Sequence, residues 1–224
     1  SDSQWKQKFH CQKIIFHKAT MDYYEEELKR KGFSVIYIKH RREKRTEDNL
    51  NYLLGKGFNH FTTYEAFDWS LEKRTKDFSI KNNIKLEIRT SEMFLTCTDI
   101  SEEIINQEKI YSMQKFYKLQ RRNLNILIEN DGSPTGGDWN FDKLNRKKLP
   151  TSIEFPKIPI INTNKFVAKA KKEVSINYEE YYGSHENFNY PISHKDAEEW
   201  LDDFLIERFN LFGDYEDALN SNHR

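Results

Sequence analysis

Cations and aromatic side chains concentrate between Ser112 and Pro150, and they are the residues of this chain best suited to binding chemistry. Lys115, Lys118 and Arg122 recur at steps of three or four residues, which places them on one face of a helix. Lysine and arginine bind phosphates, and aromatic rings stack on nucleic-acid bases. We therefore predict a nucleic-acid surface with these candidate contacts: Lys115, Lys118, Arg121, Arg122, Trp139, Asn140 and Arg146.

Two structural explanations compete with this binding role. The charged face of an amphipathic helix is most often simply solvated, and the three cations fit that description. Trp139 can instead pin a long loop to the core, and this role is compatible with binding. The sequence leaves both explanations open.

Two adjacent glycines, Gly136 and Gly137, stand immediately before the densest group of these side chains. Glycine permits backbone angles and close approaches that a Cβ atom forbids. A tryptophan, two asparagines and an arginine follow within the next nine positions. We expect a shaped loop here.

The net charge of zero conceals an uneven distribution along the chain. Residues 112–150 carry eight lysines or arginines against four acids, whereas residues 194–218 carry nine acids against two basic residues. A surface with so many carboxylates repels a polyanion. We expect any nucleic-acid surface to lie upstream of residue 194.

The sequence offers no self-contained catalytic centre. Its seven histidines lack the spacing of metal ligands, and its two cysteines, Cys11 and Cys97, support neither a disulfide framework nor a metal site. No apolar stretch approaches the roughly 20 residues that span a bilayer. We predict no catalytic residue, no metal ligand, no membrane partner and a cytoplasmic location.

Apolar spacing predicts helices that alternate with strands before residue 90. Helices are expected over 5–28, 46–55 and 69–82, with a strand at 13–16 as the alternative to part of the first. Glycine 32 is the expected stop of that first helix. Strands are expected over 34–39, 59–65 and 84–89. This alternation implies right-handed crossovers and a parallel sheet.

We assign the chain to the α/β class, with a Rossmann-like parallel sheet and flanking helices. A doubly wound sheet places its ligand-binding turn after its first strand, yet no strand and no glycine-rich phosphate loop precede the helix that starts at Trp5. We expect that the first strand or strands are missing, either by truncation or because proteins of this kind begin here.

Further helices are expected over 99–107, 112–124, 165–174 and 194–211. Asn130 to Pro134 form a turn cluster. Three prolines, at 150, 156 and 159, exclude a regular helix in the segment before the helix at 165–174. The predicted organisation is an α/β domain over 1–130, an interdomain loop over 131–162 and a helical segment over 163–224.

The segment 136–146, GGDWNFDKLNR, resembles the GGxWNFDxxNR signature of the deoxyribodipyrimidine photolyase-related proteins, the prokaryotic iron-sulfur branch of the photolyase and cryptochrome superfamily. Residues 111–122 resemble a helix of that family, with matches at Met113, Phe116, Tyr117, Arg121 and Arg122. Further similar positions are Glu65 with Trp69, Phe94 with Leu95, and the stretch 188–218. The likeness covers most of the chain in the family's order.

The resemblance implies that residues 1–130 are an antenna-type α/β domain, which the interdomain loop joins to a helical domain that binds FAD and a four-cysteine iron-sulfur cluster. Family members repair pyrimidine (6-4) photoproducts in DNA by light-driven electron transfer, or act as cryptochrome-like photoreceptors. Many carry a ribityllumazine antenna. The implied partners are DNA and the FAD-binding domain of the same polypeptide.

The chain also departs from the family pattern. It lacks the first strand with its GDQL-like turn and nearly all of the flavin and cluster domain, and Asp138 and Gln114 replace the family's usual residues. We expect no cofactor in this fragment; FAD, a 4Fe-4S cluster and a ribityllumazine antenna are expected in a longer parent protein.

We interpret the chain as the N-terminal antenna and scaffold region of a light-dependent DNA photolyase, not catalytic by itself. The alternative is a free-standing nucleotide or nucleic-acid binding Rossmann-like module without catalysis, and a structural interaction domain is the third interpretation.

Overall fold

The structure is a computed structural model that describes residues 8–39, 44–96 and 112–218. These residues fall into two compact units. The first comprises residues 44–96 and 112–141, and the second combines residues 8–39 with 142–218. Within the described residues, helices predominate and one two-stranded sheet is present.

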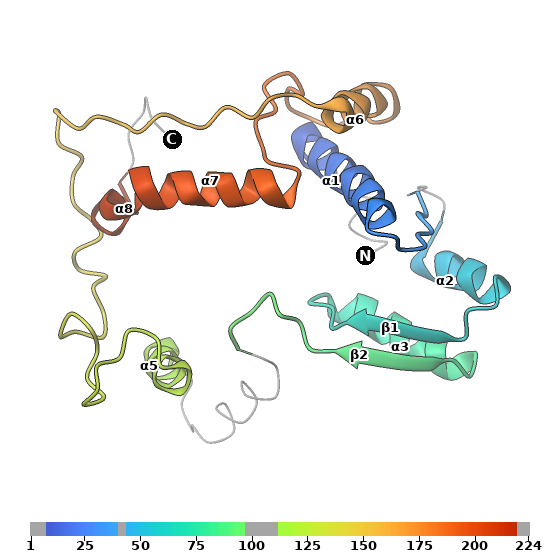
Figure 1. Ribbon diagram of the computed structural model, residues 1–224, viewed down its shortest axis with the longest axis horizontal. Coiled ribbons are helices and arrows are strands. Elements are labelled where there is room, and N and C mark those ends of the chain that lie inside the picture. The colour runs from blue at the N-terminus through green and yellow to red at the C-terminus, as the bar shows by residue number, and fades with distance from the viewer. Residues whose placement is uncertain (1–7, 40–43, 97–111, 219–224) are drawn as a thin grey trace. The chain divides into compact units, whose positions relative to one another are not determined.

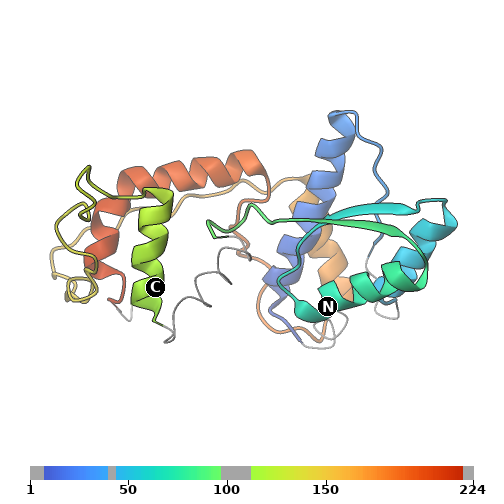
Figure 2. The same cartoon turned by 90° about the horizontal axis from the view of Figure 1, so that it is seen from below.

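The first unit contains the sheet. It comprises α2 (Thr46–Gly55), β1 (His60–Tyr64), α3 (Trp69–Lys81) and β2 (Lys85–Arg89). The two strands pair in parallel, from His60 opposite Lys85 to Tyr64 opposite Arg89. α3 connects the strands and lies along one face of the pair (Figure 1 and Figure 2). The predicted elements at 46–55, 59–65, 69–82 and 84–89 are confirmed to within one residue at each end.

Local chemistry accounts for these elements. α3 begins at Trp69 because the Asp68 carboxylate accepts a hydrogen bond of 3.0 Å from the amide of Leu71. In β2, half-buried Leu86 and Ile88 alternate with exposed charged residues, as expected of a strand with one face covered.

The predicted strand at 34–39 is wrong, because none of these residues belongs to a strand. A strand needs a neighbour that satisfies its backbone hydrogen-bonding groups, and no described strand pairs with this segment. Ile36 is 44% exposed, whereas a buried strand was predicted. The structure is therefore compatible with the α/β class, because it has helices and a small two-stranded parallel sheet. The larger Rossmann-like sheet stays a prediction.

The second unit begins with α1 (Cys11–Arg30), so the alternative strand at 13–16 is wrong. The Nδ1 atom of His10 accepts a hydrogen bond of 3.2 Å from the amide of Gln12 and caps the helix. The helix ends just before Gly32, whose φ of +88° confirms the predicted glycine stop.

α6 (Lys165–Asn177) packs against α1, although about 130 residues of chain separate them in sequence. Asn164 caps α6 by accepting hydrogen bonds of 3.0 and 3.1 Å from the amides of Phe166 and Val167. The buried core that the two helices share with the following loop consists of Cys11, Ile14, Ile15, Ala19, Val167, Ala170, Val174, Tyr178, Tyr181, Phe188 and Ile192.

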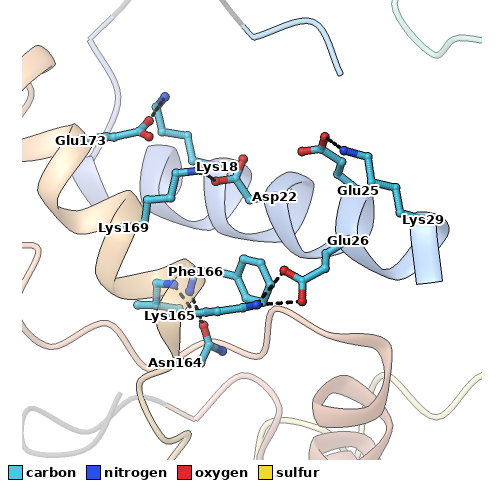
Figure 3. A network of polar contacts seen from close by, with 11 residues as sticks. Lys18, Asp22, Glu25, Glu26, Lys29, Asn164, Lys165, Phe166, Lys169 and Glu173 are labelled. Carbon is cyan, nitrogen blue, oxygen red and sulfur yellow. Dashed lines mark hydrogen bonds and ion pairs between the residues drawn. The ribbon is translucent and has the colours of Figure 1, made fainter. Parts of the chain in front are cut away.

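Charged side chains border this apolar contact in three steps, which Figure 3 shows. Positions 18, 22 and 26 of α1 face positions 173, 169 and 165 of α6 in turn, so the helices are antiparallel. The pairs are Lys18 with Glu173 at 3.0 Å, Asp22 with Lys169, and Glu26 with Lys165 at 2.7 Å.

The helix predicted over 194–211 is divided in two. α7 (His194–Glu207) starts at His194 as predicted, with Ser193 as its cap, and α8 (Phe209–Tyr215) follows. Arg208 between them leaves helical geometry at φ −123° and ψ −27°. Its guanidinium binds Asp203 at 2.8 Å and the carbonyl oxygen of Lys157, which ties the break to the proline-spaced segment.

Residues 142–164 contain no helix or strand, as the proline spacing predicts. α1, predicted within the first domain, packs on α6, predicted within the third segment, so the contacts divide the chain differently from the predicted boundaries. Those boundaries stay a prediction. The helix predicted over 99–107 lies outside the described residues. In the described chain, no helix is long and apolar enough to cross a membrane.

Candidate nucleic-acid interface

The candidate surface is built on α5 (Met113–Leu124) of the first unit. The helix starts as predicted, because the hydroxyl of Ser112 accepts a hydrogen bond of 3.4 Å from the amide of Lys115. It ends at Asn125, whose φ of +52° is left-handed. Lys115 and Arg122 are exposed and Lys118 is half-buried, so two of the predicted cations on α5 meet solvent directly.

A buried arginine holds the end of α5. Arg121 is only 6% exposed, and its guanidinium donates to the carbonyl oxygen of Ile126 at 3.2 Å and to that of Leu127. It also donates to the hydroxyl of Tyr117 at 3.5 Å. A buried cation needs such hydrogen bonds to offset its lost hydration. Arg121 was predicted as a direct nucleic-acid contact; the structure buries its guanidinium against the loop, and a contact with nucleic acid stays a prediction.

Residues 126–137 form a tight loop that returns onto the end of α5. The amide of Thr135 donates to the carbonyl oxygen of Leu127 at 2.9 Å. The Asp131 carboxylate accepts the Ser133 amide at 2.9 Å, and the hydrogen bond from the Ser133 side chain is the main reason that the pKa of Asp131 is lowered. The turn predicted at 130–134 is confirmed.

The glycine pair has the unusual backbone that the sequence predicts. Gly136 and Gly137 have φ angles of +85° and +84°. A Cβ atom on Gly136 would lie 3.2 Å from the Phe141 ring, whereas one on Gly137 would meet nothing within 4 Å. Gly136 therefore supplies both a left-handed angle and a close approach, and Gly137 supplies the angle alone.

Three cations of α5 surround the half-buried ring of Trp139. The ring centroid lies 5.7 Å from Lys118 Nζ, 5.1 Å from Arg121 Cζ and 4.7 Å from Arg122 Cζ. These cation–π contacts attach the loop to α5, which is the pinning role considered from the sequence. They also gather positive charge beside an aromatic surface, which is the combination that binds phosphate together with a base.

The structure places the other candidates differently. Asn140 is exposed and follows Trp139 in the first unit. Arg146 belongs to the second unit, where its Nε atom lies 3.4 Å from the Asp217 carboxylate. The side chains that meet around Trp139 are thus Lys118, Arg121 and Arg122.

Two contributions to these contacts were not predicted from the sequence. Tyr117 stacks on Arg121, with 5.4 Å between its ring centroid and the arginine Cζ, and their spacing of four residues on a helix was the available signal. The acids at 214 and 217 pair with the basic loop at 146–147, and no local pattern reveals a contact between segments so far apart in sequence.

Within the described ranges, no group of three or more His, Cys, Asp or Glu side chains could hold a metal ion. Cys11 carries a free thiol that is 3% exposed in the α1–α6 core, so it serves packing.

The chain is similar to a known protein family and to two known proteins. Residues 1–190 match the family described as deoxyribodipyrimidine photo-lyase-related protein. The chain is 27% identical over 96% of its length to the (6-4) photolyase of Agrobacterium fabrum, and 29% identical over 68% of its length to an uncharacterized protein of Acanthamoeba polyphaga mimivirus. It spans 44% of the length of that photolyase and 79% of the viral protein.

Proposed function

The chain belongs to the deoxyribodipyrimidine photo-lyase-related protein family, and from this premise we propose that it forms the antenna and scaffold region of a light-dependent DNA-repair flavoprotein. Its similarity to a (6-4) photolyase along nearly its whole length supports DNA repair as the function of the complete protein. In this proposal the chain contributes DNA contacts and a platform, and it works in the cytoplasm.

The observation that carries the proposal is the convergence of α5 cations on Trp139. In the proposed complex, Lys118 and Arg122 contact phosphates, and Lys115 extends the line of positive charge by one helical turn. Trp139 offers a ring surface to an unstacked base, and Asn140 offers a side-chain amide. Arg121 contacts no nucleic acid and fixes the loop that presents Trp139.

The family resemblance also implies FAD, a 4Fe-4S cluster and a ribityllumazine antenna. The residues of this chain do not fit the cluster, because four cysteines are needed and the chain has two, one of them buried in a helical core. We assign FAD and the cluster to a further part of the parent protein.

The proposed partner within the parent protein is its FAD-binding region. Along α7 and α8, the large apolar side chains of Leu201, Leu205, Phe209 and Phe212 are exposed. An apolar surface of this kind is typical of a docking site. We propose that the FAD-binding region covers it.

A second candidate function is a free-standing nucleic-acid binding module. The viral relative favours it, since the chain covers most of the length of that protein. The α5 surface is also complete within one unit and needs no cofactor.

The two functions are tested by measuring the affinity of the chain for labelled DNA over a series of salt concentrations. We compare a duplex containing a (6-4) photoproduct, its undamaged counterpart and a single strand. A repair protein binds the damaged duplex most tightly, because a lesion is already partly unstacked. A general module prefers the single strand and ignores the lesion.

The α5 surface is tested with the double variant Lys118→Ala and Arg122→Ala. It should weaken binding to every DNA and reduce the slope of log affinity against log salt by about 1 for each cation removed. The matched control removes two exposed lysines of α3, Lys73 and Lys76, and should leave binding nearly unchanged. Equal losses in both variants, or binding without salt dependence, contradict the proposed surface.

A further inference from the structure

We propose that the loop at residues 145–148 is a second phosphodiester site, closed in this structure by the carboxylates of Asp214 and Asp217, which occupy the place of phosphates. The inference rests on the proposed nucleic-acid function but concerns other residues than the α5 surface. It concerns the second unit alone.

Two ion pairs close the loop. The Nζ atom of Lys147 lies 2.8 Å from the carboxylate of Asp214, and the Nε atom of Arg146 lies 3.4 Å from that of Asp217. Lysine and arginine are the side chains that bind phosphates in nucleic-acid complexes. A carboxylate and a phosphate both present anionic oxygens to these donors, so one can substitute for the other.

The backbone joins the same two segments. The amide of Lys147 donates to the carbonyl oxygen of Asp214 at 3.2 Å, and the amide of Asp217 donates to that of Asn145 at 3.5 Å. Four interactions therefore connect residues 145–147 with 214–217, and the contact is a defined clamp rather than a chance meeting of two side chains. Residues 214–217 therefore hold two carboxylates where a polyanion would otherwise bind the loop.

The clamp is built so that a polyanion can displace it. Its paired side chains keep between 43% and 76% of their surface exposed, and water and salt screen ion pairs at such exposure. The side-chain oxygen of Asn145 is buried with no hydrogen-bond partner in the described chain. An unsatisfied buried acceptor disfavours the closed state, and opening hydrates it.

The consequence is a two-step mode of binding. A nucleic acid brings many phosphates, and these compete with two carboxylates for Arg146 and Lys147. Lys148, which is exposed beside them, adds a third cation once the loop is free. The carboxylates of Asp214 and Asp217 thus keep single anions from binding the loop, whereas a polyanion can displace them.

The test measures binding of fluorescent oligo(dT) to the full chain and to the double variant Asp214→Asn and Asp217→Asn. Opening the clamp should tighten binding by about three- to tenfold, the range expected from two exposed ion pairs. The control Glu198→Gln and Asp202→Asn makes the same change of net charge on α7, away from the clamp in sequence, and should have less than half that effect. An equal effect of both variants overturns the clamp.

A second measurement reports the clamp directly. Hydrogen exchange of the amides of Lys147 and Asp217 should quicken when oligo(dT) binds the unmodified chain, because their acceptors are withdrawn. Unchanged exchange in the bound state overturns the inference while leaving the α5 surface intact. If the double variant Lys118→Ala and Arg122→Ala does not weaken binding, this result contradicts the proposed α5 surface and leaves the clamp to be judged by its own variants. If no variant binds oligo(dT), the inference falls, and the proposed function is decided by binding to the damaged duplex.

Discussion

The α1–α6 pair and the α5 module, defined as α5 with residues 125–141, are held together by opposite means. The pair joins segments distant in sequence through buried apolar side chains, and its charges lie at the border of the contact. The α5 module joins neighbouring segments through a buried guanidinium and backbone hydrogen bonds. The Trp139 ring of the module is half-buried, and Lys115 and Arg122 are exposed.

The difference separates stability from recognition. Apolar burial is strong but non-directional, so the α1–α6 core can fix a fold without presenting any chemical group. Hydrogen bonds to a buried arginine are directional, so they fix the position of a loop that buries little surface. A surface for recognition gains from the second arrangement, because its side chains stay exposed while their backbone is held.

The largest expected effect comes from opening a cavity in the α1–α6 core. Ile15 is fully buried, and Ile15→Ala should lower the free energy of unfolding by about 2–5 kcal/mol. Ile80→Ala is the matched control, since that side chain is 80% exposed and its loss should cost less than about 0.5 kcal/mol. Urea titration measures both. Comparable losses would remove the contrast between core and surface.

Removing the guanidinium of the α5 module should have the next largest effect. Arg121→Ala removes the guanidinium donor from the carbonyl oxygen of Ile126 and leaves that of Leu127 with the Thr135 amide, at a cost of about 1–3 kcal/mol. Hydrogen exchange should quicken at Thr135 and leave α1 unchanged. Arg121→Lys keeps the charge but cannot reach both oxygens in the same geometry, so it should behave nearly like alanine. Full rescue by lysine would mean that charge alone holds the loop.

The two glycines of the α5 module give a finer comparison. Gly136→Ala and Gly137→Ala both force a side chain into a left-handed angle, at a cost of about 1 kcal/mol each. Gly136→Ala must also displace the Phe141 ring, so its loss of stability should be the larger. Thermal melting compares the two variants. The reverse order would show that the ring moves without cost.

The smallest effect concerns Tyr37 and is confined to alkaline solution. Burial, with the neighbouring Asp22 carboxylate, raises the pKa of Tyr37 to about 12 from its ordinary value of 10.0. The unfolded chain therefore loses this proton first, and the stabilisation is complete below pH 10 and is lost as the pH rises through about 12. Tyr37→Phe should flatten that decline in the free energy of unfolding. An unchanged decline would place the titrating group elsewhere.

Local patterns predicted the elements that depend on local interactions. The apolar spacing of α3 and α5 was enough to predict where these helices start, because residues three or four positions apart share a helix face. The glycine pair was likewise predictable, since glycine adopts a positive φ without the steric cost that a Cβ atom brings.

Predictions failed where a distant partner decides the outcome. The segment 34–39 has a strand-like composition, but a ladder depends on a neighbour that composition does not reveal. The break at Arg208 depends on a carbonyl oxygen some fifty residues upstream. Arg121 and Arg122 are adjacent and chemically identical, and only the loop that folds over α5 makes one of them structural.

The antiparallel pairing of α1 with α6 has a consequence for the newly made chain. Asp22 and Lys169, which meet in the finished protein, are separated by 147 residues. At ribosomal rates of about 5–20 residues per second, α1 waits about 7–30 seconds for its partner to be synthesised. During that interval Ile14 and Ile15 have no covering helix, so the nascent chain should be a substrate for chaperones until α6 emerges.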